Sequence, residues 1–143
     1  MNDRIMERVR HFLESIALRR HQLLVICEDF GGAHVKSIAA ELQVPLLNVS
    51  LILSTALKDL PVQRRPHKVR SILAGAIKNT GEKTVCLDHI ELCFERSLKQ
   101  DPLRLFEHLS RGQTLIVSWK GTYDDQELIY AEPEHAEYVR SKV

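Results

Sequence analysis

The sequence predicts a three-layer α/β fold built on a mostly parallel sheet. Short apolar runs at residues 23–27, 84–88 and 114–119 have the length and composition of buried strands. Patterns of helical period separate these runs, and strands that alternate with helices are typical of parallel sheets. Polar residues follow each run, at the end of the strand where such sheets bind their ligands.

The composition is that of one ordinary globular domain. The chain has 143 residues, of which 44% are hydrophobic and 27% charged, and its net charge of +1 indicates neither nucleic acid nor a membrane as partner. No apolar run is long enough to span a bilayer, and the charged N-terminus is unlike a signal peptide. The three cysteines lack metal-site spacing, so we expect buried thiols in a cytoplasmic protein.

Residues 1–21 are expected to form an amphipathic helix, ahead of an α/β domain at residues 22–143. Asn2 or Asp3 is a suitable cap for a helix over residues 3–20. Its apolar stripe consists of Ile5, Val9, Phe12, Leu13 and Ile16. The basic residues lie mostly off this stripe, which indicates a packed helix with a solvated basic face or, alternatively, a surface for a partner or nucleic acid.

Residues 23–42 have the layout of a P-loop: a strand, a glycine-bearing loop, Lys36-Ser37 and a helix. In a P-loop, backbone N–H groups at the helix N-terminus hold phosphate, the lysine reaches the β- and γ-phosphates, and the hydroxyl ligates Mg²⁺. The candidate nucleotide-binding residues are Gly31, Gly32, Ala33, His34, Val35, Lys36 and Ser37. Phe30 and Val35 stand where the motif has glycine, so an ordinary strand-to-helix turn is the alternative.

The middle of the chain predicts a strand at residues 44–49 and a helix at 51–60, capped by Asn48 or Ser50. Pro66 suits the first position of the next helix, and Gly81 the C′ position after it. Basic residues crowd the start of that helix, where the macrodipole disfavours them. A solvated surface or an anionic partner would account for them.

The C-terminal part predicts a helix with Asp101 as N-cap, which ends at Gly112. A turn-rich connection at residues 121–126 then leads to a short strand at 127–131, and a hairpin with the preceding strand is an option. Residues 134–140 are expected to add one or two helical turns.

Asp88 ends an apolar strand, as the carboxylate of a Walker B element does, and would hold Mg²⁺ opposite Ser37. The next residue is usually a glutamate that activates water, and here it is His89. His89 or Glu91 could take that role, with a surface histidine as the alternative. Ser118 or Lys120, at the end of the later strand, could contact the γ-phosphate. Candidates for a charge-stabilising arginine from a neighbouring subunit are Arg96, Arg104 and Arg111.

A linked pattern in the C-terminal half is similar to a known family. It comprises residues 87–94, 100–105, 109–111, 118–121 and 130–135. With the P-loop layout, it resembles the BrxF family, the small P-loop proteins of type 3 bacteriophage-exclusion (BREX) systems. The resemblance implies an AAA-like P-loop ATPase fold, ATP and Mg²⁺ as ligands, and antiphage defence beside other proteins of the system. It also implies indirect contact with DNA at most, and a homo-oligomer because sites of this class are typically shared between subunits.

Two other interpretations compete with a weak or partner-dependent ATPase. A catalytically dead P-loop scaffold would keep the fold and serve as a subunit. Residues 37–53 also fit the spacing of a helix-turn-helix, which predicts a DNA-binding regulator. The second helix of that unit would be mostly apolar, with almost no side chains suited to reading base edges.

Overall fold

The computed structural model describes residues 3–16, 21–28, 34–124, 127–130 and 139–142. The helices are α1 (Asp3–Ser15), α2 (His34–Leu42), α3 (Val49–Leu57), α4 (Val69–Asn79) and α5 (Pro102–Leu109), with short 3₁₀ turns η2 (Val62–His67), η3 (Glu91–Phe94) and η4 (Arg96–Leu98). The strands are β1 (Leu23–Glu28), β2 (Leu46–Asn48), β3 (Thr84–Asp88), β4 (Thr114–Asp124), β5 (Glu127–Tyr130) and β6 (Val139–Lys142). None of the helices in these ranges combines the length and the apolar character that a membrane crossing requires.

Four strands pair in parallel in the spatial order β2-β3-β4-β1. β4 lies between β1 and β3, with Glu28 beside Lys120 and Leu87 beside Val117. β2 lies on the other side of β3, where Asn48 pairs with Asp88. The predicted α/β class with a mostly parallel sheet is therefore confirmed, and the carboxyl ends of all four strands point the same way.

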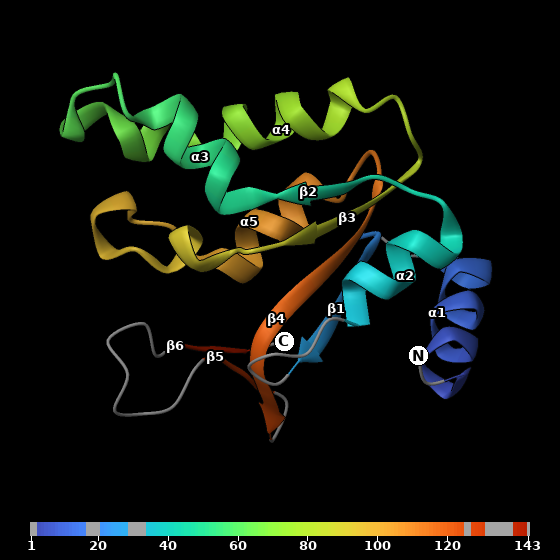
Figure 1. Ribbon diagram of the computed structural model, residues 1–143. Helices are drawn as coiled ribbons and strands as arrows, with labels where there is room; N and C mark the ends of the chain where they lie inside the picture. The colour runs from blue at the N-terminus through green and yellow to red at the C-terminus, as the bar shows by residue number, and fades with distance from the viewer. Residues whose placement is uncertain (1–2, 17–20, 29–33, 125–126, 131–138, 143) are drawn as a thin grey trace.

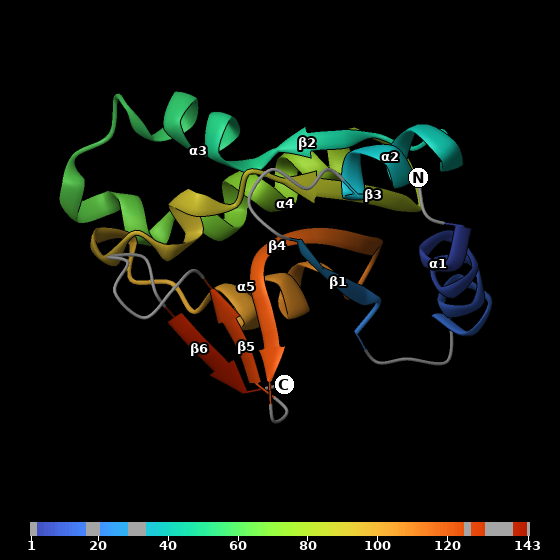
Figure 2. The same cartoon turned by 60° about the horizontal axis from the view of Figure 1, so that its bottom comes forward.

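Helices cover both faces of the parallel sheet (Figures 1 and 2). Successive side chains of a strand point to opposite faces, and the two cores follow this alternation. Val117 and Trp119 of β4 pack in one core with α3, α4 and α5. In this core the ring centroids of Trp119 and Phe94 are 5.2 Å apart in an edge-to-face arrangement. Ile116 of β4 and Cys86 of β3 pack in the other core with α1 and α2. The polar strand-end residues described below share the face of α1 and α2.

β4 is longer than the sequence predicts. Its first part pairs with β1 and β3, and Gly121–Asp124 pairs antiparallel with β5. The predicted hairpin is thus confirmed, whereas the predicted turn at residues 121–126 is wrong over 121–124, because β5 supplies ladder partners there. Of the predicted helical turns at 134–140, residues 134–138 lie outside the described ranges, and 139–140 belong to strand β6, which pairs with β5.

The predicted residues at the start of α5 and after α4 are confirmed, but the predicted first residue of α4 is wrong. The Asp101 side chain accepts a hydrogen bond from the Arg104 N–H, with Pro102 first in α5, and Gly81 follows α4 with φ of 70°. Both were expected from residue type. Pro66 does not open α4: it lies inside η2, and the helix begins at Val69. The predicted first position is wrong because the Lys68 N–H bonds to the Arg65 carbonyl, which closes a 3₁₀ turn around the proline.

The segment 37–53 does not form a helix-turn-helix. Such a unit joins two helices through a short turn, but here β2 lies between α2 and α3 and pairs with β3 inside the sheet. Of the apolar residues that would have weakened a recognition helix, Leu53 is buried in the core and Ile52 packs against it, whereas Leu51 is 62% exposed.

Candidate functional site

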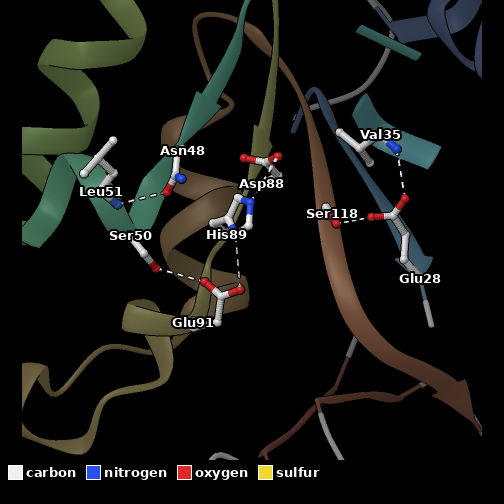
Figure 3. Close-up of polar contacts among 9 residues, drawn as sticks. All are labelled: Glu28, Val35, Asn48, Ser50, Leu51, Asp88, His89, Glu91 and Ser118. Atoms are coloured by element: carbon white, nitrogen blue, oxygen red, sulfur yellow. Dashed lines mark hydrogen bonds and ion pairs between the residues drawn. The ribbon is translucent and has the colours of Figure 1, made fainter. Parts of the chain in front are cut away.

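Polar side chains gather where β1, β2 and β3 end, beside Ser118 within β4. Glu28 closes β1, Asn48 closes β2, Asp88 closes β3 and Ser118 lies on β4 beside them (Figure 3). Parallel strands place these ends at one edge of the sheet, which is where open α/β sheets bind ligands. Asn48 has a structural role there: its side chain accepts a hydrogen bond from the Leu51 N–H and caps α3.

Glu28 connects β1, α2 and β4. Glu28 is only 3% exposed. One carboxylate oxygen accepts a hydrogen bond from the Val35 backbone N–H at 2.9 Å, and the other accepts one from the Ser118 hydroxyl. The first N–H groups of a helix have no partner within the helix, so Glu28 satisfies one of these donors from the preceding strand (Figure 3).

The Lys-Ser pair of the P-loop layout lies in the first turn of α2. Lys36 is exposed and Ser37 is half-buried. His34 is also in this turn, but it lines a cavity of about 290 Å³ between α1 and β1 together with Ile5 and Val9. Gly31, Gly32 and Ala33 lie outside the described residues. The first turn therefore keeps Lys36 and Ser37 as the candidates for ligand contact, while His34 faces α1.

The Asp88 carboxyl, at the end of β3, is influenced by charged groups from β1 and β4 and from the turn that follows β3. Burial raises the pKa of this carboxyl, and the negative charges of Glu91 and Glu28 raise it further. The neighbouring positive charges of His89 and Lys120 oppose this shift. A carboxyl that is costly to ionise, in a cluster at the strand ends, is one that a cation would stabilise.

His89 follows Asp88 in a left-handed backbone conformation, with φ of 50°. Its Nε2 lies 3.8 Å from an Asp88 carboxylate oxygen, and its Nδ1 lies 3.7 Å from an oxygen of Glu91. Left-handed backbone in a residue other than glycine carries strain and is often found at functional sites. This turn holds the imidazole between two carboxylates (Figure 3).

Ser50 fixes Glu91 from the start of α3. The Ser50 hydroxyl donates to Glu91 at 3.0 Å and accepts from the Leu92 N–H at 3.1 Å. The Ser50 backbone N–H donates to the His89 carbonyl at 2.8 Å. Three hydrogen bonds thus tie β2–α3 to the turn after β3, and they set the positions of both His89 and Glu91.

The structure brings together part of the predicted site. Asp88, His89 and Glu91 form one group, Val35 and Ser118 meet at Glu28, and Asp88 is electrostatically coupled to both Glu28 and Lys120. Of the predicted arginine candidates, Arg104 pairs with Glu107 on its own helix.

Glu28 is not among the site residues that the sequence predicts, and Ser50 is predicted only as a helix cap. A carboxylate that ends an apolar run was the available signal for Glu28, the same signal that selected Asp88. Ser50 and Glu91 are 41 residues apart in the chain, and no local pattern links them.

Oxygen donors dominate the cluster, which bears on the kind of metal it suits. The described residues contain no group of three or more His, Cys, Asp and Glu side chains arranged to hold a metal by themselves. Mg²⁺ rarely uses such a cage; it is bound by one or two protein oxygens together with substrate phosphates and water. The Ser37 hydroxyl and the Asp88 carboxylate each offer an oxygen donor of the kind that Mg²⁺ uses.

A comparison of the chain with protein-family models, with curated proteins and with solved structures finds no match to any of them.

Proposed function

We propose that this chain is an ATP- and Mg²⁺-binding P-loop protein with slow or partner-dependent ATPase activity. One observation carries the proposal. Lys36 and Ser37 lie in the first turn of α2, the helix that follows β1, and Asp88 and Ser118 lie at the same edge of the sheet on β3 and β4. With only β4 between them, β1 and β3 lie about 10 Å apart across the sheet, a span that a triphosphate with its cation can bridge.

Each residue has a defined part in this proposal. Lys36 contacts the β- and γ-phosphates, as the lysine of a P-loop does. Ser37 and Asp88 hold Mg²⁺, which neutralises charge on the phosphate oxygens. Ser118 or Lys120 contacts the γ-phosphate.

Hydrolysis needs a group that orients or deprotonates water. The proposed groups are His89 and Glu91, which Ser50 holds beside Asp88. Three departures from the motif favour slow turnover: Phe30 and the β-branched Val35 stand where the motif has glycine, and His89 replaces the usual glutamate.

The resemblance to the BrxF family extends the proposal to antiphage defence in the bacterial cytoplasm. Its partners would be other proteins of the phage-exclusion system, and the site would be completed in a homo-oligomer. Arg96 and Arg111, both exposed, are available for that contact. Gel filtration with and without ATP tests the oligomer, and a monomer in both runs contradicts it.

A catalytically dead scaffold is the second candidate. The observation in its favour is Glu28, because a buried carboxylate already bonds to the Val35 N–H at the start of α2. Such a subunit would keep its partners and bind no nucleotide.

Calorimetric titration of ATP, with and without Mg²⁺, tests the function. The wild type is expected to bind in the presence of Mg²⁺, and Lys36→Ala is expected to weaken binding at least about tenfold, as for a lost charge-assisted hydrogen bond. Lys58→Ala, which removes another exposed lysine at the end of α3, is the matched control and should bind like the wild type. Absence of ATP binding in all three proteins would favour the catalytically dead scaffold over the ATP-binding protein.

A further inference from the structure

The carboxylate of Glu28 already occupies the N-terminus of α2. The Val35 N–H, which a phosphate at this helix N-terminus would need, donates to Glu28 at 2.9 Å. Val35 directly precedes Lys36, so the contested donor is next to the lysine proposed to bind the phosphates. A helix N-terminus attracts negative charge through its unpaired N–H groups and its dipole, and Glu28 uses that attraction within the folded chain.

The carboxylate is firmly held in this position. Glu28 is 3% exposed, and the Ser118 hydroxyl donates to its second oxygen from the neighbouring strand. Ser118 is itself 2% exposed. Hydrogen bonds to a charged acceptor are roughly twice as strong as those between neutral groups, so removing the carboxylate from this position has a cost that any incoming anion must offset.

A phosphate and the Glu28 carboxylate cannot share the Val35 N–H. Two anions at hydrogen-bond distance from one donor would repel each other strongly in a buried setting. Glu28 also adds to the negative charge around Asp88, which raises the pKa of that carboxyl.

We propose that Glu28 is an internal occupant of the phosphate position, so that nucleotide binds only in molecules whose Glu28 carboxylate has left the Val35 N–H. The proposal rests on the nucleotide-binding function proposed above. It gives the site a closed state, held by Glu28 and Ser118, and an open state in which the N–H is available. The observed affinity for nucleotide is then reduced by the fraction of molecules that are closed.

The test compares ATP·Mg²⁺ affinity by calorimetry in the wild type, Glu28→Gln and Glu28→Asp. Glu28→Gln removes the charge but keeps the shape, and Glu28→Asp keeps the charge but withdraws it by one methylene. Both variants are expected to bind about tenfold tighter or more, the scale of one charge-assisted hydrogen bond. Glu41→Gln is the matched control, because it removes an equal charge from an exposed position on α2 and should leave affinity unchanged.

The possible outcomes separate this inference from the function on which it rests. Wild-type affinity in both Glu28 variants overturns the inference and leaves nucleotide binding intact. Unchanged affinity with lost turnover in Glu28→Gln also overturns it, and would make Glu28 a catalytic group instead. No binding in the wild type or any variant overturns both.

Circular dichroism establishes that the variants are folded. Nuclear magnetic resonance of the wild type gives a second test that needs no variant. In the wild type, the Val35 amide resonance is expected to shift when ATP·Mg²⁺ is added, because its acceptor changes from carboxylate to phosphate. An unshifted resonance at saturating ATP would contradict the proposal.

Discussion

The Glu28 carboxylate, at the end of β1, accepts a hydrogen bond from the backbone N–H of Val35 in the first turn of α2, seven residues later in the chain. An ordinary N-cap supplies this acceptor from a residue adjoining the helix. Here it comes from the neighbouring strand and is held from the other side by Ser118. A single carboxylate thus joins the helix that carries Lys36 to β4, and it stabilises the folded chain at the position where nucleotide is proposed to bind.

Asp88→Asn is expected to raise the free energy of unfolding at neutral pH. Burial raises the pKa of the Asp88 carboxyl above its ordinary value of 3.8, so the folded chain holds this proton more tightly than the unfolded chain does. Stability from the protonated form is present in acid and is lost as pH rises through the raised pKa. The gain in Asp88→Asn should therefore shrink when urea unfolding is repeated in mildly acid buffer.

Asp59→Asn, at an exposed position after α3, is the control for the loss of one negative charge. If Asp88→Asn were less stable than the wild type at neutral pH, Asp88 would be a net stabilising group. Under the proposed function, the same variant should also lose the Mg²⁺ dependence of ATP binding.

Ser50→Ala is expected to lower the free energy of unfolding by about 1–3 kcal/mol, the cost of leaving a partly buried donor unsatisfied. The substitution removes the acceptor of the Leu92 N–H and the donor to Glu91. Ser54→Ala is the matched control on the same helix, because its exposed hydroxyl bonds to the carbonyl of Leu51, three residues earlier. Urea unfolding of both variants measures the difference, and equal losses would show that the Ser50 hydroxyl has no special role.

His89→Gly is expected to be more stable than His89→Ala by about 1 kcal/mol, because φ of 50° strains every residue that has a Cβ atom. Both variants lose the same contacts with Asp88 and Glu91, so their difference isolates the backbone. Thermal unfolding of the pair provides the measurement. Equal stability would indicate that the turn relaxes when the imidazole is absent.

Cys27 is expected to react with a thiol reagent before Cys86 and Cys93 in the native protein. Burial raises the pKa of Cys86 and Cys93 to about 12, so almost none of either thiol is ionised at neutral pH. Cys27 is only half-buried, and burial raises its pKa as well. Mass spectrometry of peptides after timed labelling gives the order of reaction, with urea-unfolded protein as the control in which all three should react. Equal native rates would contradict the described burial.

Much of the fold follows from local residue patterns. The three apolar runs predicted as strands are strands β1, β3 and β4, and all four central strands are parallel. The cap of α5 follows from Asp101 and Pro102 by residue type alone. The length of β4 does not follow, because Gly121 and its neighbours become strand only when β5 pairs with them.

The candidate site divides in the same way. Lys36, Ser37 and Asp88 could be selected from the sequence, because each stands at a recognisable position relative to its own strand or helix. Their surroundings could not be selected. Glu28 and Ser118 are 90 residues apart, and only the pairing of β1 with β4 brings them into contact.

The sequence by itself thus determined the class of fold, the order of its strands and helices as far as β5, and the strand ends that carry polar groups, because these depend on neighbouring residues and on periodicity. Only the tertiary structure decided that the Val35 N–H bonds to Glu28 and that Ser50 holds Glu91 beside His89. The physical reason is that hydrogen bonds between side chains of distant segments depend on sheet register and helix packing, which no local stretch of sequence specifies.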